Sequence, residues 1–337
     1  MPARNAARWL GGTLESIAAQ SYPSYEVILV DDASTDGTAA IARAWSGPLR
    51  LVRGPGRGIV AALEAGRAAL LPQTDLIARM DADDLMAPER LALQVAALER
   101  EPRLSVVASR VQLLRDFDEA VAAPLAHPGA AAGDGMGRYV DWLNTIDSPE
   151  SVAREMFVES PVCHPAVMIR RTALDDVDGY EDHPWTEDYD LWLRLHLAGH
   201  TFRVLPEVLH VWRDHGARTT RTDPRCAPER FSVLKAYYLV RRYGRELRIW
   251  GAGRDGRRLA RALQAEGASI TAFYDVDPKK IGRLCRGAPV HSYEALRGPG
   301  DGPPIVTAVG IPEARALIRE ALDQRGYAEG RDYVCAA

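Results

Sequence analysis

The chain has 337 residues, too many for one ordinary hydrophobic core, so we expect two domains. Hydrophobic residues make up 47% and charged residues 26% of the sequence, a globular composition that excludes an intrinsically disordered protein. The net charge of −4 and the pI of about 6.1 argue against a non-specific nucleic-acid binder, so we expect no nucleic-acid partner.

Cysteine usage and hydropathy indicate the compartment. The four cysteines have neither a CxxC spacing nor the spacing of a disulfide framework, which favours a reducing compartment. The sequence has no run of 18 apolar residues and no recognisable signal peptide. We therefore expect a cytoplasmic protein without a transmembrane segment. The sequence leaves open a peripheral contact with the inner face of the membrane, made through a bound molecule that lies there.

Strands and helices alternate along the first part of the chain. Apolar periodicity predicts helices at residues 6–20, 35–45, 58–71 and 84–99, and strands at 25–34, 49–53 and 75–84. Later residues predict strands at 105–114 and 165–171, and helices at 186–199 and 227–244. Such alternation indicates an α/β fold with a mostly parallel sheet flanked by helices, whose ligands bind at the carboxyl ends of the strands.

Aspartates gather at those strand ends. Asp31 and Asp32 follow one predicted strand. Asp81 and Asp83 end another, so we expect all four at one rim of one sheet. Asp81 and Asp83 are two residues apart and share a face, where paired carboxylates need a hard divalent cation such as Mn²⁺ or Mg²⁺. The alternative is that Asp83 or Asp84 caps the helix predicted to follow.

Five stretches together resemble the inverting glycosyltransferases of family 2, which have the GT-A fold. They are EVILVDDASTDGT, IARMDADDLMAPERL, CHPAVMIRR, DGY and TEDYDLWLRLHLAG, in the family's order, and the likeness covers roughly residues 1–240. The resemblance implies a nucleotide-sugar donor, most often UDP-linked, and transfer with inversion at the anomeric carbon.

The resemblance assigns the donor side of the site to the strand ends. Asp32 would contact the base, Asp81 the ribose or the diphosphate, and Asp83 the metal ion. The other residues expected to bind the nucleotide sugar are Pro2, Arg4, Asn5, Asp31 and Arg57. From the residues alone, the stretch DDASTDG fits a plain turn equally well.

A late loop supplies further candidates. His215 is a candidate third metal ligand, because some family members place a histidine in this loop, although a loop histidine is often simply solvated. Arg213 and Arg218 could clamp a diphosphate, or they could stand there by chance in an arginine-rich chain. His164, in CHPAV, lies in the stretch that resembles the family's acceptor side, and a packed histidine fits it equally well.

The acceptor side of the site lies in WTEDYD. Inverting transfer needs a carboxylate that takes the proton of the acceptor hydroxyl. The resemblance places this base in the pair Glu187 and Asp188, of which we favour Asp188. The alternative is that both acids complement the dipole of the helix that they begin. The expected acceptor is a glycan or a lipid-linked molecule.

The sequence departs from the family in two places. The Pro-x-x-Asn turn is present as Pro2 to Asn5, but the apolar strand that normally precedes it is missing. We therefore expect the native chain to begin upstream of Met1, because loss of that strand would expose its neighbours in the sheet. Glu64 stands where the family often has asparagine.

The strand–helix pattern restarts at residue 247, and we predict domains at residues 1–243 and 244–337. Gly251, Gly253 and Gly256 form a G-x-G-x-x-G turn between a strand and a helix, and Asp275 follows the next strand. This is the context of a dinucleotide fingerprint. The stretch FYDVDPKKIGRLCRGAPV also resembles the nucleotide-sugar-binding domain of bacterial sugar acyltransferases. NAD(P), a nucleotide sugar and no ligand are all open for this Rossmann-like domain, and a scaffold or an undefined small ligand is favoured over a redox cofactor.

The favoured function is a metal-dependent inverting hexosyltransferase that serves cell-surface glycan assembly, the last point by family analogy alone. The alternatives are a non-catalytic nucleotide-sugar sensor and a redox protein that uses the C-terminal glycine turn.

Overall fold

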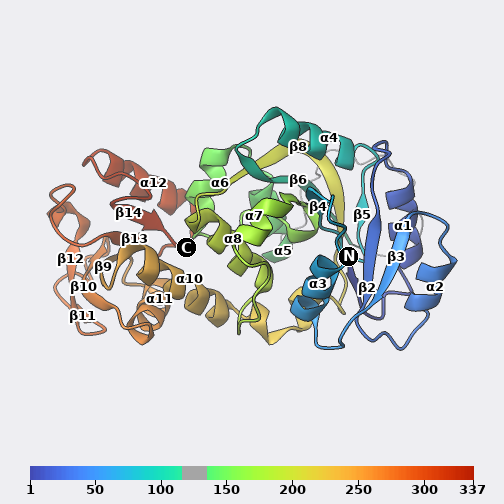
Figure 1. The fold of residues 1–337 in the computed structure, drawn as a ribbon. Coiled ribbons are helices and arrows are strands. Elements are labelled where there is room, and N and C mark those ends of the chain that lie inside the picture. The colour runs from blue at the N-terminus through green and yellow to red at the C-terminus, as the bar shows by residue number, and fades with distance from the viewer. Residues whose placement is uncertain (116–134) are drawn as a thin grey trace. The chain divides into compact units, whose positions relative to one another are not determined.

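The computed structural model describes residues 1–115 and 135–337 (Figure 1). The chain divides into two compact units. The first comprises Met1–Ala153, Pro161–His183 and Glu187–Thr222, and the second Arg154–Ser160, Pro184–Thr186 and Asp223–Ala337. Helix α10 (Pro228–Tyr243) groups with the second unit, because it packs on α11 (Arg254–Ala265), whereas the predicted boundary at 243/244 put it in the first. The predicted domain limits stay a prediction.

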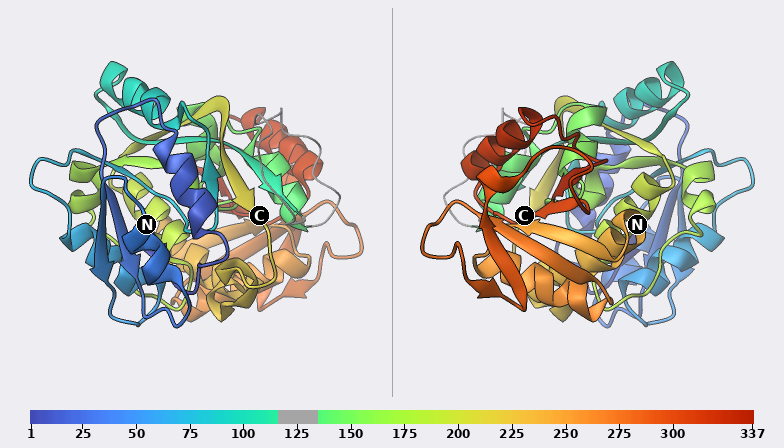
Figure 2. Two further views of the ribbon diagram at one scale, coloured as in Figure 1. Left: turned by 90° about the vertical axis from the view of Figure 1, so that its right-hand side faces the viewer. Right: turned by 90° about the vertical axis from the view of Figure 1, so that its left-hand side faces the viewer.

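A small parallel sheet begins the first unit. Its strand order is β1 (Pro2–Ala3), β2 (Val27–Asp31) and β3 (Leu49–Arg53). The helices that alternate with these strands are α1 (Leu10–Ala18), α2 (Thr38–Ala44) and α3 (Ile59–Ala68). Figure 2 shows these blue elements from two further sides, with the strands side by side. Because all three strands run in one direction, the turns that follow them meet at one edge of the sheet.

The second sheet of this unit is mixed. Its order is β4 (Leu76–Ala78), β7 (Met168–Arg170), β6 (Leu104–Leu114), β8 (Thr201–Arg213) and β5 (Leu85–Met86). Within it only β6 and β8 pair in parallel. The expected α/β class is confirmed, and this sheet is mixed because β7 returns from β6 to lie between β6 and β4. The two sheets share no strand, so the aspartates predicted at one sheet follow strands of two.

The further helices up to residue 222 are α4 (Arg90–Arg100), α5 (Gly135–Leu143), α6 (Pro149–Glu155), α7 (Arg171–Asp176), α8 (Glu187–Leu197) and α9 (Thr219–Thr222). Helices of the first unit differ in how much of their surface is buried. Helix α1 buries one apolar stripe, Leu10, Leu14 and Ile17, against β2. Helix α8 buries Leu191, Trp192 and adjacent residues on all sides, so its first turn belongs to the core of the unit.

A cavity of about 790 Å³ lies in the first unit, lined by residues of β2, β4, α3 and α4. Strand β1 covers only the last two residues of β2, Val30 and Asp31. The strand expected before the Pro-x-x-Asn turn stays a prediction.

The second unit contains a parallel sheet with one antiparallel edge strand. Its order is β11 (Leu284–Cys285), β12 (Ala288–Ser292), β10 (Ser269–Asp275), β9 (Glu246–Trp250), β13 (Ile305–Thr307) and β14 (Tyr333–Cys335), and α12 (Pro312–Asp323) follows β13. The first strand of the unit, β9, lies in the middle, as in doubly wound sheets. The glycine turn leads from β9 into α11.

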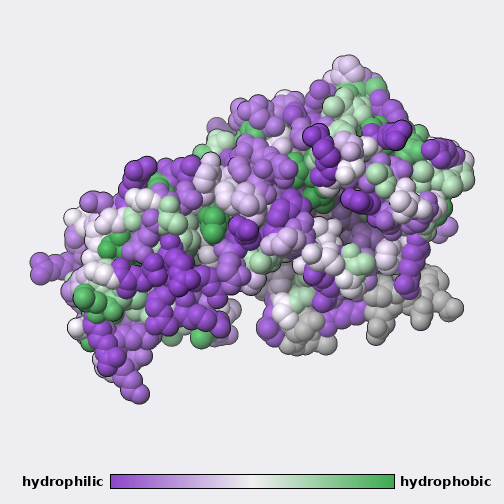
Figure 3. Space-filling model, turned by 90° about the horizontal axis from the view of Figure 1, so that it is seen from below, coloured by the Kyte–Doolittle hydropathy of each residue, from purple (hydrophilic) through white to green (hydrophobic). Residues whose placement is uncertain are grey.

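Polar residues dominate the face drawn in Figure 3, and apolar residues occur there in small, scattered patches. The exposed large apolar side chains of the described chain are Val276, Leu284, Ile311 and Leu317, all in the second unit. Within residues 1–115 and 135–337, no helix is both long and apolar enough to cross a membrane.

The glycine turn gives a stability prediction for the second unit. A Cβ at Gly256 would lie 1.7 Å from the carbonyl oxygen of Gly251, whereas a Cβ at Gly253 would meet nothing within 4 Å. Gly253 also has an ordinary φ of −81°. We expect Gly256→Ala to cost about 3 kcal/mol or more, as forced overlap in a packed interior does, and Gly253→Ala to cost only about 1 kcal/mol, because alanine is a poorer N-cap for α11 than glycine. Chemical denaturation followed by circular dichroism checks this, and equal stability of the two variants would contradict it.

Candidate functional site

Three turns meet at the edge of the small parallel sheet. Asn5, in the Pro-x-x-Asn turn, has a φ of +51° and accepts a hydrogen bond from the Thr35 backbone at 2.8 Å. The backbone N–H of Asn5 donates to Ser34 Oγ at 2.9 Å. Pro2 lies in β1, and the side chains of Arg4 and Asn5 are exposed. The turn after β1 is thus bound to the turn after β2.

Asp32 holds the third turn. Its carboxylate is buried and accepts from the backbone N–H groups of Gly56 at 2.7 Å and Gly58 at 2.9 Å. Arg57, between them, is exposed at the same edge. Asp31 accepts from the backbone of Ser34 at 3.1 Å. Each oxygen of Asp32 therefore already has a partner, and contact of this residue with a base stays a prediction.

An acidic cluster follows β4. Oxygen atoms of Asp81, Asp83 and Asp84 all lie within 4.8 Å of one another. Asp83 Oδ2 lies 2.8 Å from His215 Nε2. Carboxylate oxygens with one imidazole suit a divalent ion such as Mn²⁺ or Mg²⁺, so the donor set fits the metal ion that GT-A enzymes typically bind.

Asp84 differs from its neighbours because it is fully buried. It accepts from His210 Nε2 at 3.0 Å and from the Arg213 backbone at 2.8 Å, and burial raises its pKa to about 7. Arg90 lies 3.1 Å from His210 Nδ1 and can only donate, which leaves the ring proton on Nε2, facing Asp84. Asp84 therefore binds β8 to the β4 end. Neither Asp83 nor Asp84 caps a helix, because α4 begins at Arg90, so the capping interpretation is wrong.

Trp9 joins the acidic cluster to the first turns. Its ring stacks on that of His215, with centroids 4.1 Å apart. In the next turn of the chain, Thr13 Oγ1 donates to the carbonyl oxygens of Ala82 and Asp84. The late loop therefore lies against α1, and the structure brings His215, Asp83 and the turn after β1 together.

Two buried arginines face Asp81. Arg79 lies 2.8 Å from one of its oxygens and Arg218 lies 3.8 Å from the other. Burial alone would lower the pKa of Arg79, but Asp81, Tyr180 and Glu187 outweigh that effect and raise it. Arg213 lies beside Asp83 and Asp84, where burial lowers its pKa.

The Glu-Asp pair begins α8, as predicted. Glu187 is buried, with 7% of its surface exposed, whereas Asp188 is half-buried. Asp188 Oδ1 accepts from the backbone of Tyr189 at 2.7 Å. Of the two carboxylates, Asp188 is the more accessible to a substrate.

His164 and Tyr180 lie next to this pair. His164 Nε2 is 2.9 Å from the Tyr180 hydroxyl, and Nδ1 is 4.0 Å from Glu187 Oε1. Burial, reinforced by the charge of Arg79, lowers the pKa of His164 well below its ordinary value, so the ring is neutral. Burial also raises the pKa of Tyr180, which keeps its phenol protonated.

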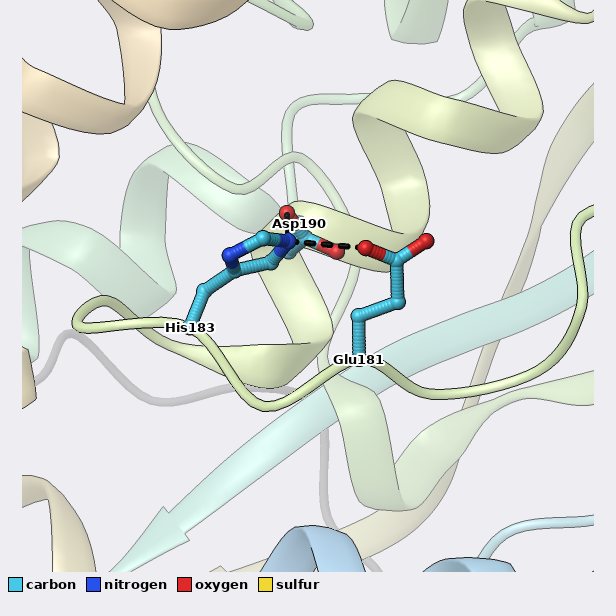
Figure 4. Close-up of side chains that lie close together, drawn as sticks. All are labelled: Glu181, His183 and Asp190. Carbon is cyan, nitrogen blue, oxygen red and sulfur yellow. Dashed lines mark hydrogen bonds and ion pairs between the residues drawn. The ribbon is translucent and has the colours of Figure 1, made fainter.

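A second group of ionisable side chains precedes and enters α8 (Figure 4). Glu181 and His183 come from the loop and Asp190 from the helix, with His183 Nε2 at 2.8 Å from Glu181 and 4.0 Å from Asp190. Arg194 bonds Asp190 at 2.8 Å and donates to the Gly179 carbonyl. Arg194 already supplies a positive charge to these carboxylates. We therefore assign the group a structural role, in which it fastens the loop to α8.

In the second unit the predicted ligand residues contact one another. Asp275 accepts from the Ala252 backbone at 2.8 Å, inside the turn that contains Gly251, and from Lys280 Nζ at 3.1 Å. Gly251, Gly253, Gly256 and Asp275 thus lie at one end of the sheet, and a ligand there stays a prediction.

Trp9, Arg79, Tyr180 and His210 were not among the predicted site residues. Arg79 had a usable signal, because an arginine within the apolar run LIARM must find a counter-charge when the strand is buried. Tyr180 lies in the DGY stretch, which gave it no role by itself, and Trp9 and His210 are recognised only through contacts that are distant in sequence.

The neutral state of His164 predicts a pH-dependent stability. Its pKa is far below 6.5 in the folded protein and near 6.5 in the unfolded chain, so the unfolded chain binds the proton first as the pH falls. The contribution of the neutral histidine to the free energy of unfolding is complete above about pH 6.5. It is lost below that pH, by at most about 1.4 kcal/mol per pH unit. Urea denaturation at several pH values should show a shallower acid loss for His164→Gln than for the unmodified chain. Parallel pH profiles would contradict the prediction.

Comparisons with known proteins identify the family of this chain. Residues 1–178 match the family described as Glycosyl transferase family 2. EpsE of Bacillus subtilis, which is named as a glycosyltransferase, is 32% identical over 217 residues, which cover 62% of this chain and 70% of EpsE. The amylovoran biosynthesis glycosyltransferase AmsE of Erwinia amylovora is 30% identical over 200 residues, covering 58% of this chain and 67% of AmsE.

Solved structures agree on the fold. The crystal structure of S. aureus TarS 1-349 in complex with UDP-GlcNAc has a TM-score of 0.51 and 17% sequence identity, and the match covers 78% of this chain and 70% of TarS. At that identity the likeness shows the fold alone. By the family match and the curated relatives, this chain belongs to glycosyltransferase family 2 and is a GT-A-fold transferase that acts on nucleotide sugars.

Proposed function

We propose that the chain is an inverting, metal-dependent hexosyltransferase that uses a UDP-linked sugar and a hydroxyl acceptor. The observation that carries the proposal is the acidic cluster at 81–84, with His215 at 2.8 Å from Asp83. Carboxylates this close, with an imidazole beside one of them, are expected to bind a divalent cation when the enzyme works.

Asp83 and His215 would hold the metal ion, Mn²⁺ or Mg²⁺, with Asp81 toward the diphosphate. Asp84 is committed to His210 and the Arg213 backbone, so we leave it out of the ligand set. A bound divalent ion would stabilise the negative charge that develops on the departing diphosphate. Arg218, which is buried beside Asp81, would supply a second positive charge to the departing diphosphate.

The donor base would lie at the edge formed by the three turns of the small sheet. Asn5 fixes the first turn to the second, and Asp32 fixes the third. Exposed Arg4 and Arg57 then stand at the rim of the pocket, and Pro2 and Asp31 complete it. In this proposal Asp32 acts by shaping the loop around Arg57 as well as by accepting from the base.

Asp188 would act as the base. It would take the proton of the acceptor hydroxyl while that oxygen attacks the anomeric carbon, on the face opposite the departing diphosphate. Its partial exposure supports the choice over buried Glu187. The helix N-terminus favours the ionised form of Asp188, the form that can accept a proton, although it also weakens the base.

The proposed acceptor is a glycan or a lipid-linked sugar of cell-surface polysaccharide assembly. AmsE is named for amylovoran biosynthesis, and ExoU of Rhizobium meliloti, 27% identical over 209 residues, for succinoglycan biosynthesis. We propose a cytoplasmic location, at the inner face of the membrane when the acceptor is lipid-linked.

Removal of Asp83 tests the metal site. We expect UDP binding, measured by calorimetry, to be stronger with Mn²⁺ than without it. Asp83→Ala should remove the Mn²⁺ effect and weaken binding by at least about 100-fold, because even indirect metal-site changes cost 10–100-fold. Glu89→Ala, an exposed carboxylate in the same stretch, is the matched control and should bind as the unmodified chain does.

Metal-dependent UDP binding that survives in Asp83→Ala would refute the metal assignment. If a folded sample binds no UDP, the same titration with GDP, dTDP and CMP tests the other bases, and binding of one of these would refute only the uridine assignment.

Replacement of Asp188 tests the base. Release of UDP from UDP-glucose, UDP-galactose and UDP-GlcNAc, with water as the acceptor, should fall by about 10²–10⁴-fold in Asp188→Asn, while UDP binding is unchanged. Asp182→Asn, an exposed carboxylate just before α8, is the control and should keep its activity. Unchanged turnover in Asp188→Asn would rule out this residue as the base.

A further inference from the structure

Tyr180 is held at both of its ends. Its backbone N–H donates to Glu64 Oε1 at 2.8 Å, and its hydroxyl lies 2.9 Å from His164 Nε2. The residue before it, Gly179, has a φ of +76°, and a Cβ there would lie 2.5 Å from Glu64 Oε1. The backbone bond fastens the turn to α3, and the hydroxyl contact places the phenol beside His164.

The direction of the hydrogen bonds follows from the chemistry of the partners. The phenol of Tyr180 keeps its proton and can donate to His164 Nε2, which requires that Nε2 carries no proton of its own. His164 is neutral and has one ring proton, which must then be on Nδ1. Nδ1 faces Glu187 Oε1 at 4.0 Å, and a carboxylate can only accept. The tautomer that suits Tyr180 is thus the one that suits Glu187.

Packing leaves the imidazole little freedom to turn. His164 is 6% exposed and begins a short 3₁₀ turn, His164–Ala166, next to β7. The edge of the Trp192 ring lies against it, with centroids 5.6 Å apart. Trp192 is itself fully buried in α8. The histidine is therefore fixed by the same helix whose first turn it faces.

We propose that His164 is a positioning residue for the catalytic base, which accepts a hydrogen bond from the Tyr180 hydroxyl at Nε2 and presents Nδ1–H toward Glu187. Asp188 follows Glu187 directly in the first turn of α8, so holding Glu187 in place holds the turn from which the Asp188 carboxylate projects. This inference rests on the proposed function, in which Asp188 is the base.

The proposal also explains why a charged residue, Glu187, is buried next to the base. Arg79 contributes positive charge to the same neighbourhood, since Glu187 is among the groups that raise its pKa. The carboxylate of Glu187 thus has the His164 imidazole at 4.0 Å and interacts electrostatically with Arg79.

The tautomer can be measured without any activity. In a ¹⁵N-histidine-labelled sample, His164 should show a protonated Nδ1 and an unprotonated Nε2, assigned by its disappearance in His164→Gln. Tyr180→Phe should shift the Nε2 signal, because it removes only the hydroxyl that donates to it. A protonated Nε2, or no response to Tyr180→Phe, would overturn the proposal.

Kinetics separate positioning from packing. Asparagine can offer an N–H near the place of Nδ1, whereas glutamine reaches the place of Nε2 and leucine offers neither. With the UDP-sugar that turns over, we expect His164→Asn to retain most of kcat. His164→Gln and His164→Leu should lose up to about 100-fold in kcat, the cost of a misplaced catalytic group, with the donor KM within about twofold. His291→Gln, an exposed histidine of the second unit, is the control.

The outcomes test the positioning role of His164 separately from the role of Asp188 as the base. Loss of turnover in Asp188→Asn with full turnover in His164→Leu overturns the positioning role alone. Equal losses in all three His164 variants, with lowered thermal stability, mean that the histidine only packs. Full turnover in Asp188→Asn refutes the base on which this inference rests, and it leaves the tautomer measurement as a separate result.

Discussion

The carboxylates at residues 81, 83 and 84 repel one another, and much of the first unit is arranged to neutralise them. One oxygen of each lies within 4.8 Å of the others, and two full negative charges at that separation repel each other by roughly 3 kcal/mol at an effective dielectric constant of 20. The compensating groups come from the end of β4, from β8 and from the loop after it. They are Arg79, His210, Arg213, His215 and Arg218. The position of β8 and its loop therefore depends on this charge balance.

The three carboxylates therefore have different partners and different roles. Asp84 is buried and accepts hydrogen bonds from His210 and from a backbone N–H, so its role is structural. Burial raises its pKa. Asp81 already has an arginine at 2.8 Å. Asp83 lies 2.8 Å from the imidazole of His215, a side chain that can itself bind a metal ion, so it is the carboxylate that we propose as a metal ligand. The stack of Trp9 on His215 keeps that imidazole within reach.

The sequence predicted the elements that carry the site better than the contacts inside it. Aspartates after an apolar strand and a Glu-Asp pair beginning a helix are local patterns, and both occur where expected. The role of Asp84 was wrong, because its partner His210 lies 126 residues away along the chain. The two sheets could not be separated either, since local periodicity does not fix which strands pair or in which direction. Asp32 had a turn signal, and its carboxylate indeed holds a loop.

Glu64 shows how a departure from the family pattern fits the same arrangement. An asparagine at this place could accept from the Tyr180 N–H but would bring no charge. The carboxylate does both, since it accepts from Tyr180 at 2.8 Å and pairs with Arg67, which also reaches Asp175. The turn that carries Tyr180 is thereby fastened to α3 by an ion pair as well as by a hydrogen bond. Because α3 also begins at the loop held by Asp32, one helix is connected at its start to the edge of the small sheet and along its length to the turn of Tyr180.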